Sequence, residues 1–281
     1  MKTMPGRLLD VNNYLAHFDH ARTLSNPQLC AEIDRVWDSY GLDNRKKVSE
    51  QQIGPFYSHP VWILNGLFAE ADPVSLGHRR AISNFIFNHS DDPLREIHIA
   101  DFGGGSGVLA EVISRYCSNV AAIDIVEPWP FDYFTARHAG NGKIRYVDDF
   151  VTDGYDFVIA EDVLEHVEDP IQVALRCINA ARVNGYLIFA NCFYPAIKCH
   201  LPQTFYLRHT FRYVITSHAL VFEGVVPGAN HAQVFIKTAG VDEEAIRGRA
   251  HLAQRLGPLL NRAGEIKAQL GRVLRDLGLR H

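Results

Sequence analysis

The sequence predicts a doubly wound α/β fold built around a mixed, mostly parallel sheet. Between residues 95 and 240, short runs rich in β-branched and aromatic residues alternate with helical segments, a rhythm typical of βαβ units. A glycine-rich turn separates the first run from the first helical segment. The region ends in two β runs joined by a tight turn, so one strand must run antiparallel to the others. These observations together predict a seven-stranded sheet.

Five runs are expected to form the parallel part of the sheet: Ile97–Phe102, Val120–Ile125, Lys143–Val147, Tyr155–Ala160 and Tyr186–Ala190. The terminal hairpin has strands at Ala219–Val226 and His231–Lys237, joined by the turn Pro227–Asn230. Helices are expected between the runs, over Val108–Cys117 and from the end of the fourth run through Arg182.

Residues 1–94 read as an N-terminal helical cap, with breaks at several prolines. Asn26 followed by Pro27 is typical of a helix start, with Asn26 as the N-cap and proline in the first turn. This helix is expected to run to about Tyr40, and a second one to cover Val74–His89.

Residues 241–281 read as a C-terminal amphipathic helix. Apolar residues recur in alternating steps of four and three from Leu252 to Leu277, which is the spacing of a heptad seam. Pro258 is expected to occupy the first turn of the helix proper. Two interpretations stay open. The seam packs on the helix's own domain, or it joins a second copy or another protein.

The composition indicates an ordinary globular chain. Its 281 residues are 47% hydrophobic and 21% charged, and the net charge is −4, so no basic footprint for nucleic acid is present. The five cysteines are scattered without a Cys-x-x-Cys pair, as expected for reduced thiols. No apolar stretch approaches the ~18 residues of a membrane span and no signal peptide is recognisable at the N-terminus. We therefore expect a cytoplasmic protein.

The segment that indicates chemistry is the turn Gly103–Gly107, which follows the first strand. A dinucleotide fingerprint starting at Gly103 would need glycine where Val108 stands, and a phosphate-binding loop would need a lysine that is absent nearby. The remaining pattern, D-x-G-x-G-x-G starting at Asp101, resembles the first motif of class I S-adenosylmethionine-dependent methyltransferases. That resemblance implies a Rossmann-like sheet.

Further positions extend the resemblance over about residues 95–240. Asp124 ends the second strand, 23 residues after Asp101, where an acid can accept bonds from both ribose hydroxyls. Asp148-Asp149-Phe150 follows the third strand, where the family often places an acid that meets the adenine amino group. The segment Tyr155–Pro170 looks like the family's fourth strand with its Leu-Glu-His signature, and the terminal hairpin matches its antiparallel strand.

The resemblance implies that S-adenosylmethionine is the cofactor. Asp101 is then expected to order the glycine loop and meet the methionine amino group. The residues expected to bind the cofactor are Asp101, Gly103, Gly104, Gly105, Gly107, Asp124, Ile125, Asp148, Asp149 and Glu161.

The acceptor is expected to be a hydroxyl of a sugar, a glycan or another small molecule. Because an oxygen nucleophile usually needs a base, His200 and His166 are the catalytic candidates. His166 also has a structural interpretation, as a residue that packs against the cofactor loop. Residues expected to line the acceptor pocket are Tyr57, His59, Asp162, Tyr194, Tyr206, Arg208 and His209.

Two alternatives to this function stay open. The acceptor atom could be the nitrogen of an amino sugar or another amine, or the chain could bind the cofactor as a catalytically silent partner of another enzyme. A zinc site is not expected, because the spacing of Cys192, Cys199, His200 and His209 fits no standard ligand pattern.

Overall fold

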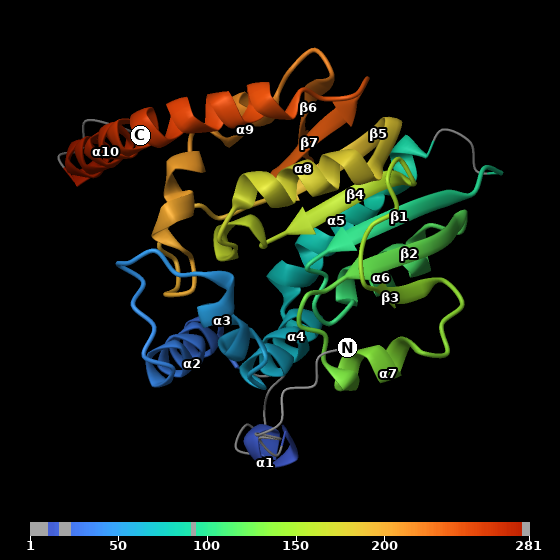
Figure 1. The fold of residues 1–281 in the computed structure, drawn as a ribbon. Coiled ribbons are helices and arrows are strands. Elements are labelled where there is room, and N and C mark those ends of the chain that lie inside the picture. The colour runs from blue at the N-terminus through green and yellow to red at the C-terminus, as the bar shows by residue number, and fades with distance from the viewer. Residues whose placement is uncertain (1–10, 17–23, 91–93, 277–281) are drawn as a thin grey trace.

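The computed structural model describes residues 11–16, 24–90 and 94–276, and its centre is one seven-stranded sheet of order β3-β2-β1-β4-β5-β7-β6 (Figure 1). The strands are β1 (Ile97–Phe102), β2 (Val120–Val126), β3 (Ile144–Val147), β4 (Tyr155–Glu161), β5 (Ala181–Ala190), β6 (Leu220–Val226) and β7 (Ala229–Lys237). The first five pair in parallel, and β7 is antiparallel to both β5 and β6. The predicted fold class is confirmed.

The strand register brings the ends of β1, β2 and β4 to one edge. Phe102, the last residue of β1, pairs with Val126 on one side and with Ala160 on the other. The N–H of Gly103 then donates to the Val126 carbonyl at 2.8 Å. Residues that follow these three strands therefore meet at the same carboxyl edge.

Helices cover both faces of the sheet (Figure 1). One apolar core contains Ile99, Ile123 and Ile159 and packs against α5 and α6. The other contains Phe102, Val158 and Phe189 and packs against α8, α9 and α10. The covering helices are α5 (Pro73–His89), α6 (Val108–Tyr116), α7 (Asp132–His138), α8 (Pro170–Ala180), α9 (Phe211–Ile215) and α10 (Glu243–Asp276), with 3₁₀ turns η2 (Leu164–His166) and η3 (Pro202–Leu207).

The N-terminal helices α1 (Val11–Ala16), α2 (Asn26–Ser39), α3 (Glu50–Tyr57) and α4 (Val61–Ala71) form the predicted helical region. Ser25, rather than Asn26, is the N-cap of α2, and its N–H donates to the Gln28 side chain at 2.8 Å. Trp37 and Phe56 are fully buried in a separate core that also takes in Leu201 from the segment after β5. The division of the chain into three parts stays a prediction, and α5 itself packs on the sheet.

The C-terminal helix corrects one prediction. Pro258 does not start the helix, because α10 runs unbroken from Glu243 to Asp276. Asp242 caps its first turn by accepting the N–H of Ala245 at 3.0 Å. Pro258 lies on an exposed side of the helix, where water can satisfy the carbonyl that loses its N–H donor.

The face of α10 that touches the domain is not the heptad seam. The buried residues are Ile246, Ala250, Ala253 and Gly257. A Cβ on Gly257 would stand 2.5 Å from the Tyr206 carbonyl oxygen, so the helix approaches η3 as closely as glycine allows. The seam is exposed instead, at Leu252, Leu256, Leu259, Ile266, Leu270 and Val273. In the part of the chain that the structure describes, no helix is long and apolar enough to cross a membrane.

Candidate functional site

The glycine loop joins β1 to α6 at the carboxyl edge of the sheet, where open α/β sheets bind their ligands. Gly103, Gly105 and Gly107 have φ of 70°, 51° and 77°, which residues with a Cβ rarely adopt. A Cβ on Gly105 would meet only the Gly103 carbonyl oxygen, 3.9 Å away. Ile125 packs against Gly107 from β2. The loop is thus supported from the sheet and leaves open space beside Gly105.

Asp101, near the end of β1, is 1% exposed, and its Oδ2 has no hydrogen-bond partner among the described residues. A Cβ on Gly104 would stand 2.5 Å from that oxygen. Burial, with Glu161 nearby, raises the pKa of Asp101 to about 8. An unpartnered buried carboxyl group is unfavourable until a ligand supplies a donor. Asp101 and the loop therefore fit the amino group of S-adenosylmethionine.

The acid that reaches the glycine loop from β2 is Glu127, which the sequence analysis did not select. Glu127 follows the last residue of β2, and its Oε2 accepts the Gly105 N–H at 3.0 Å. Its Oε1 accepts the Trp129 N–H at 3.1 Å. Burial raises the pKa of Glu127 above its ordinary value. Its position directly before Pro128, where the β run stops, is the signal that could have found it.

Asp124 lies further back along β2, beside Ala100 of β1. Asp124 is 6% exposed, and its carboxylate already accepts two hydrogen bonds. Arg145 Nε donates to it at 2.8 Å and the Tyr155 hydroxyl at 3.0 Å. The cofactor role of Asp124 stays a prediction, and the structure gives that carboxylate a structural ion pair.

The acids after β3 lie beside an aromatic and cationic wall. Asp148 and Asp149 are both exposed, and Asp149 accepts from Arg176 at 2.8 Å. The Arg176 guanidinium lies 5.2 Å from the centre of the Phe102 ring, and the Phe150 ring lies 5.5 Å from the Phe102 ring. Flat aromatic and guanidinium faces at this edge suit a planar base.

A groove of about 940 Å³ opens beside this wall. It begins at Phe102 and Trp129 on the sheet edge, passes the first turn of α8 and η3, and reaches α10 at Gln254 and Asn261. Its volume is within the range of small-molecule sites.

The end of β4 carries two acids and receives a cation from α5. Arg79 pairs with Glu161 at 3.5 Å, and the Arg79 Nε is buried without a hydrogen-bond partner among the described residues. Asp162 follows with a φ of 53°, held by its N–H bond to the Ala190 carbonyl at 2.8 Å. Glu161 and Asp162 therefore stand at the junction between the loop and the segment after β5.

The two candidate bases, His166 and His200, are neighbours in space, although His166 lies in η2 and His200 in the segment that leads to η3. The rings of His166 and His200 pack edge to face with centroids 4.8 Å apart. His166 Nδ1 is 3.1 Å from the Cys199 carbonyl, and His200 Nδ1 is 2.8 Å from the Tyr194 carbonyl. Burial lowers the pKa of His166 to about 3, helped by His200, and burial also lowers the pKa of His200. Both rings are neutral at pH 7, the state a base requires.

Aromatic residues of the cap and of the β2–α7 segment cover these histidines. Tyr57 stacks on Trp129 with centroids 4.9 Å apart, and both Tyr57 and Trp62 meet the edge of the His166 ring at 6.2 Å. The Tyr57 hydroxyl is buried without a hydrogen-bond partner among the described residues. Tyr57 therefore lies beside His166 in the structure, and its predicted acceptor role stays a prediction.

The other predicted acceptor residues are dispersed. His59 lies inside the cap, where its Nδ1 accepts the Val61 N–H at 3.0 Å. Tyr206 packs in the core beneath α10, and His209 lies beside Gly264 of α10. Arg208 lies 5.2 Å from the exposed Tyr194 ring. Their acceptor roles stay predictions, and the structure groups only Tyr57, Tyr194 and Asp162 with the two histidines or the strand end that leads to them.

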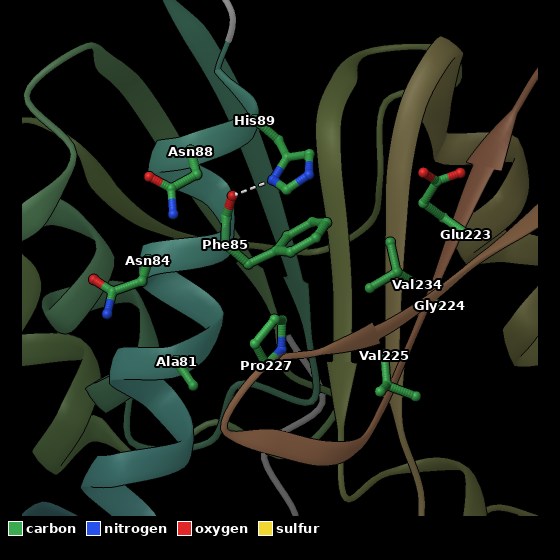
Figure 2. Close-up of a pocket in the computed structure, with 10 residues that line it drawn as sticks. All are labelled: Ala81, Asn84, Phe85, Asn88, His89, Glu223, Gly224, Val225, Pro227 and Val234. Carbon is green, nitrogen blue, oxygen red and sulfur yellow. Dashed lines mark hydrogen bonds between the residues drawn. The ribbon is translucent and has the colours of Figure 1, made fainter.

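A second, smaller cavity of about 300 Å³ lies between α5 and the β6–β7 hairpin (Figure 2). His89 and Phe85 border it, stacked with ring centroids 3.9 Å apart. Its lining contains none of the residues predicted for the cofactor or the acceptor. This cavity is separate from the site at the carboxyl edge.

The strand order with an antiparallel β7, the left-handed glycine loop and the acid after β2 define a class I methyltransferase fold of the Rossmann-like type. A family model described as "Methyltransferase domain" matches residues 78–219. The chain therefore belongs to the S-adenosylmethionine-dependent methyltransferases.

Curated relatives with similar sequences include two ubiquinone biosynthesis O-methyltransferases. The one from Yersinia enterocolitica is 28% identical over 161 residues, covering 53% of this chain and 63% of that protein. The one from Yersinia pestis is 30% identical over 157 residues, covering 51% and 61%. The match thus spans less than two thirds of these relatives.

Solved structures share the fold at low sequence identity. A phosphoethanolamine N-methyltransferase from Haemonchus contortus, in complex with phosphoethanolamine and S-adenosylhomocysteine, aligns with a TM-score of 0.52 at 13% identity, over 87% of this chain and 57% of that one. The mitomycin 7-O-methyltransferase MmcR aligns with a TM-score of 0.51 at 16% identity, over 78% and 74%.

Proposed function

We propose that the chain transfers a methyl group from S-adenosylmethionine to a hydroxyl of a small-molecule acceptor, with sugars and glycans as the acceptor class. The observation that carries the proposal is the unpartnered Asp101 carboxyl group next to a glycine loop that Glu127 holds through the Gly105 N–H and that leaves open space beside Gly105. When bound, the cofactor supplies a methyl group on a sulfonium with a built-in leaving group.

The chain's own residues have three tasks in this proposal. Asp101 and Glu127 hold the amino end and the ribose on the two sides of the glycine loop. Tyr57 and Trp129 stack beside His166 and exclude water there, which strengthens the local electrostatic interactions. One of the neighbouring pair His166 and His200 takes the proton of the acceptor hydroxyl, because alignment alone does not activate a neutral alcohol.

The hydroxyl is favoured over an amine by the histidine pair, because a neutral amine needs no base before methyl transfer. The acceptor approaches from the segment after β5, where Asp162 and Tyr194 are exposed. Exposed hydrogen-bonding groups at this mouth suit a polyhydroxylated acceptor. All five cysteines are free thiols, which supports the proposed location in a reducing compartment, the cytoplasm.

The exposed seam of α10 supports a second proposal, that α10 pairs with α10 of another copy of this chain. The large apolar side chains of the seam, from Leu252 to Val273, follow the heptad spacing, and each of them is 45–66% exposed. A heptad face is self-complementary, since knobs and holes repeat along it.

Isothermal titration tests the function most directly. The chain is expected to bind S-adenosylmethionine and S-adenosylhomocysteine, and to transfer labelled methyl groups into a small-molecule and glycan extract. Absence of binding to both compounds would refute the proposal. Binding without transfer into any fraction would favour the silent-partner alternative, and a label on nitrogen would favour the amine.

A further inference from the structure

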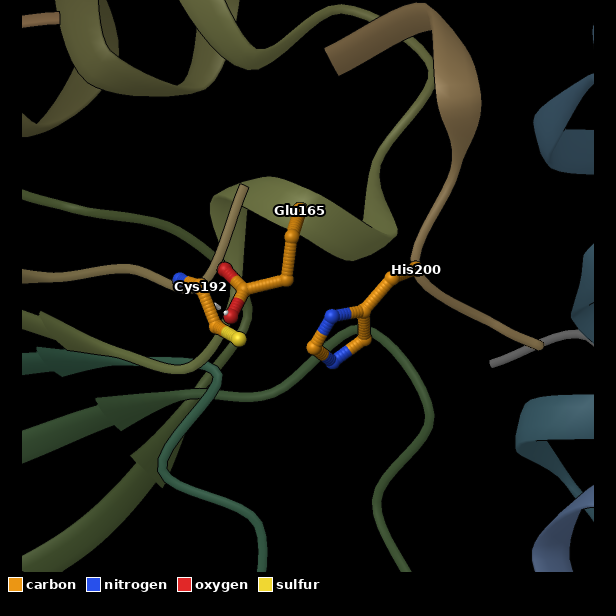
Figure 3. A group of neighbouring side chains, drawn as sticks. All are labelled: Glu165, Cys192 and His200. Atoms are coloured by element: carbon orange, nitrogen blue, oxygen red, sulfur yellow. Dashed lines mark hydrogen bonds between the residues drawn. The ribbon is translucent and has the colours of Figure 1, made fainter. Parts of the chain in front are cut away.

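Three potential metal ligands from separate segments converge next to the histidine pair (Figure 3). Glu165 comes from η2, Cys192 from the residues just after β5, and His200 from the segment that leads to η3. One donor atom of each lies within 4.8 Å of the donor atoms of the other two. No single sequence motif signals this group, because the fold brings the three segments together.

Glu165 is the member of this three-residue group whose buried environment favours a bound cation. It is fully buried, with 0% exposure. Its Oε1 accepts the Cys192 N–H at 2.8 Å, whereas its Oε2 has no hydrogen-bond partner among the described residues. None of the ion pairs in the described ranges includes Glu165. A buried carboxylate needs either a proton or a positive charge, because its desolvation is costly.

The donor chemistry selects among cations. A thiolate and an imidazole nitrogen together bind zinc and other borderline-soft ions, whereas magnesium and calcium prefer oxygen ligands. The His200 ring is 6% exposed and shares one nitrogen with the Tyr194 carbonyl at 2.8 Å, so its neutral form keeps one lone pair for a metal. A carboxylate, a thiolate and a neutral imidazole would balance the two charges of zinc.

We propose that Glu165, Cys192 and His200 bind a zinc ion beside the histidine pair. Binding forms one bond each from oxygen, sulfur and nitrogen to the ion, and it releases the protons of the Cys192 thiol and of the Glu165 carboxyl group to solvent. Three protein ligands leave a fourth position open, as in catalytic zinc sites. Cys192 is the half-buried member of the three, so solvent and an acceptor can reach the group from its side.

The role of this ion rests on the proposed methyl transfer. An acceptor hydroxyl bound at the fourth position becomes more acidic, because a zinc-bound oxygen loses its proton more readily. His200 is then a ligand, and His166, whose ring is 4.8 Å from that of His200, is the residue placed to accept the proton. His200 thus serves as a zinc ligand and His166 as the base.

The test is metal content, measured without activity. The full chain is purified without an affinity tag, dialysed against zinc and analysed by elemental mass spectrometry. It is expected to hold roughly one zinc ion per chain, and the cobalt-loaded chain is expected to show a thiolate-to-cobalt charge-transfer band. Cys192→Ser and Glu165→Gln are each expected to weaken zinc binding by more than about tenfold. Cys192→Ser must also remove the charge-transfer band.

Cys30→Ser is the matched control, because Cys30 lies on α2, outside the group, and its loss must leave zinc content unchanged. Circular dichroism shows that each variant is folded. A wild-type zinc content below about a tenth of an ion per chain, or equal content in wild type and both variants, overturns the proposal. Titration of S-adenosylmethionine on the same samples separates the two proposals, because a chain that binds the cofactor but takes up no zinc refutes the zinc site and leaves the methyltransferase function intact.

Discussion

Glu127 accepts the backbone N–H of Gly105 at 3.0 Å, which ties the end of β2 to the middle of the glycine loop. The same carboxylate is half-buried and faces the place where the ribose is proposed to lie. We predict that Glu127→Gln weakens S-adenosylmethionine binding by about 10–100-fold, because a hydrogen bond to a charged group contributes roughly 1.5–3 kcal/mol. Isothermal titration at fixed pH measures the change.

Asp124→Asn is the matched control for that experiment, because it changes the acid predicted from the sequence. Its carboxylate pairs with Arg145 at 2.7 Å inside the sheet. We expect the variant to lose stability in urea unfolding while it keeps its cofactor affinity within about twofold. The reverse pattern, with affinity lost in Asp124→Asn and kept in Glu127→Gln, would assign the ribose to Asp124.

Asp101 makes cofactor binding depend on pH. Burial is the main cause that raises the pKa of Asp101 to about 8, and the negative charges of Glu161 and Glu127 raise it further. The positive charge of Arg79 lowers it. At pH 6 the carboxyl group of the free chain is protonated, so a cationic amino group must displace that proton. We predict that affinity increases as pH rises from about 5.5 to 7, by up to about tenfold per unit.

The matching stability effect has a definite sign. A carboxyl group whose folded pKa lies above its unfolded value destabilises the fold as pH rises between the two values, here from about 4 to 8. Titrations in buffers of different ionisation enthalpy are expected to show proton release on cofactor binding near pH 7. Asp101→Asn must abolish both the release and the pH dependence of affinity, and persistence of either in that variant would contradict the assignment.

Two glycines of α10 give opposite predictions. A Cβ on Gly257 would stand 2.5 Å from the Tyr206 carbonyl oxygen, whereas a Cβ on Gly248 would meet nothing within 4 Å. Gly257→Ala is expected to destabilise the chain by about 1–3 kcal/mol through overpacking against backbone. Gly248→Ala is expected to stabilise it by up to about 1 kcal/mol, because alanine favours the helix. Urea unfolding measures both, and equal effects would mean that α10 does not pack on η3 this closely.

The sheet could be predicted from the sequence because its signals are local. Most strands are short β-rich runs bounded by turn residues, and β1 and the Gly103–Gly107 loop appear where the pattern predicts them, whereas β5 begins at Ala181, before the predicted start at Tyr186. The glycine loop could also be predicted from the sequence, because the positive φ at three alternating positions requires glycine there. These features depend on neighbouring residues only.

The features that the sequence did not reveal depend on distant contacts. Asp124 and Glu127 both look like the acid that ends a strand, and only the pairing of Phe102 with Val126 shows that β2 runs on to the residue directly before Glu127. The heptad periodicity of α10 is formed mainly by large leucines, whereas the helix packs on its own domain through Ala250, Ala253 and Gly257. Small residues have little hydrophobic signal, yet they allow the closest approach between backbones.

The seam of α10 gives a prediction about assembly. Leu259 and Leu270 are 66% and 58% exposed, and Ile266 between them is 51% exposed, so their replacement removes apolar surface without opening a core. We expect light scattering to show a dimer or larger assembly for the wild-type chain. The triple variant with glutamine at these three positions is expected to be monomeric with unchanged unfolding. A wild-type monomer at high concentration would refute self-association.

The histidine pair gives the last prediction. Because the rings of His166 and His200 pack edge to face and one of them is proposed to take the acceptor proton, removing either is expected to lower the rate of methyl transfer by about 100-fold or more. Neither ring is proposed to contact the cofactor, so affinity for S-adenosylmethionine is expected to stay within about twofold. The measurement is single-turnover transfer of labelled methyl groups. His218→Ala, at an exposed residue just before β6, is the control. An unchanged transfer rate in both His166→Ala and His200→Ala would exclude the pair as the source of acceptor activation and would favour an amine acceptor.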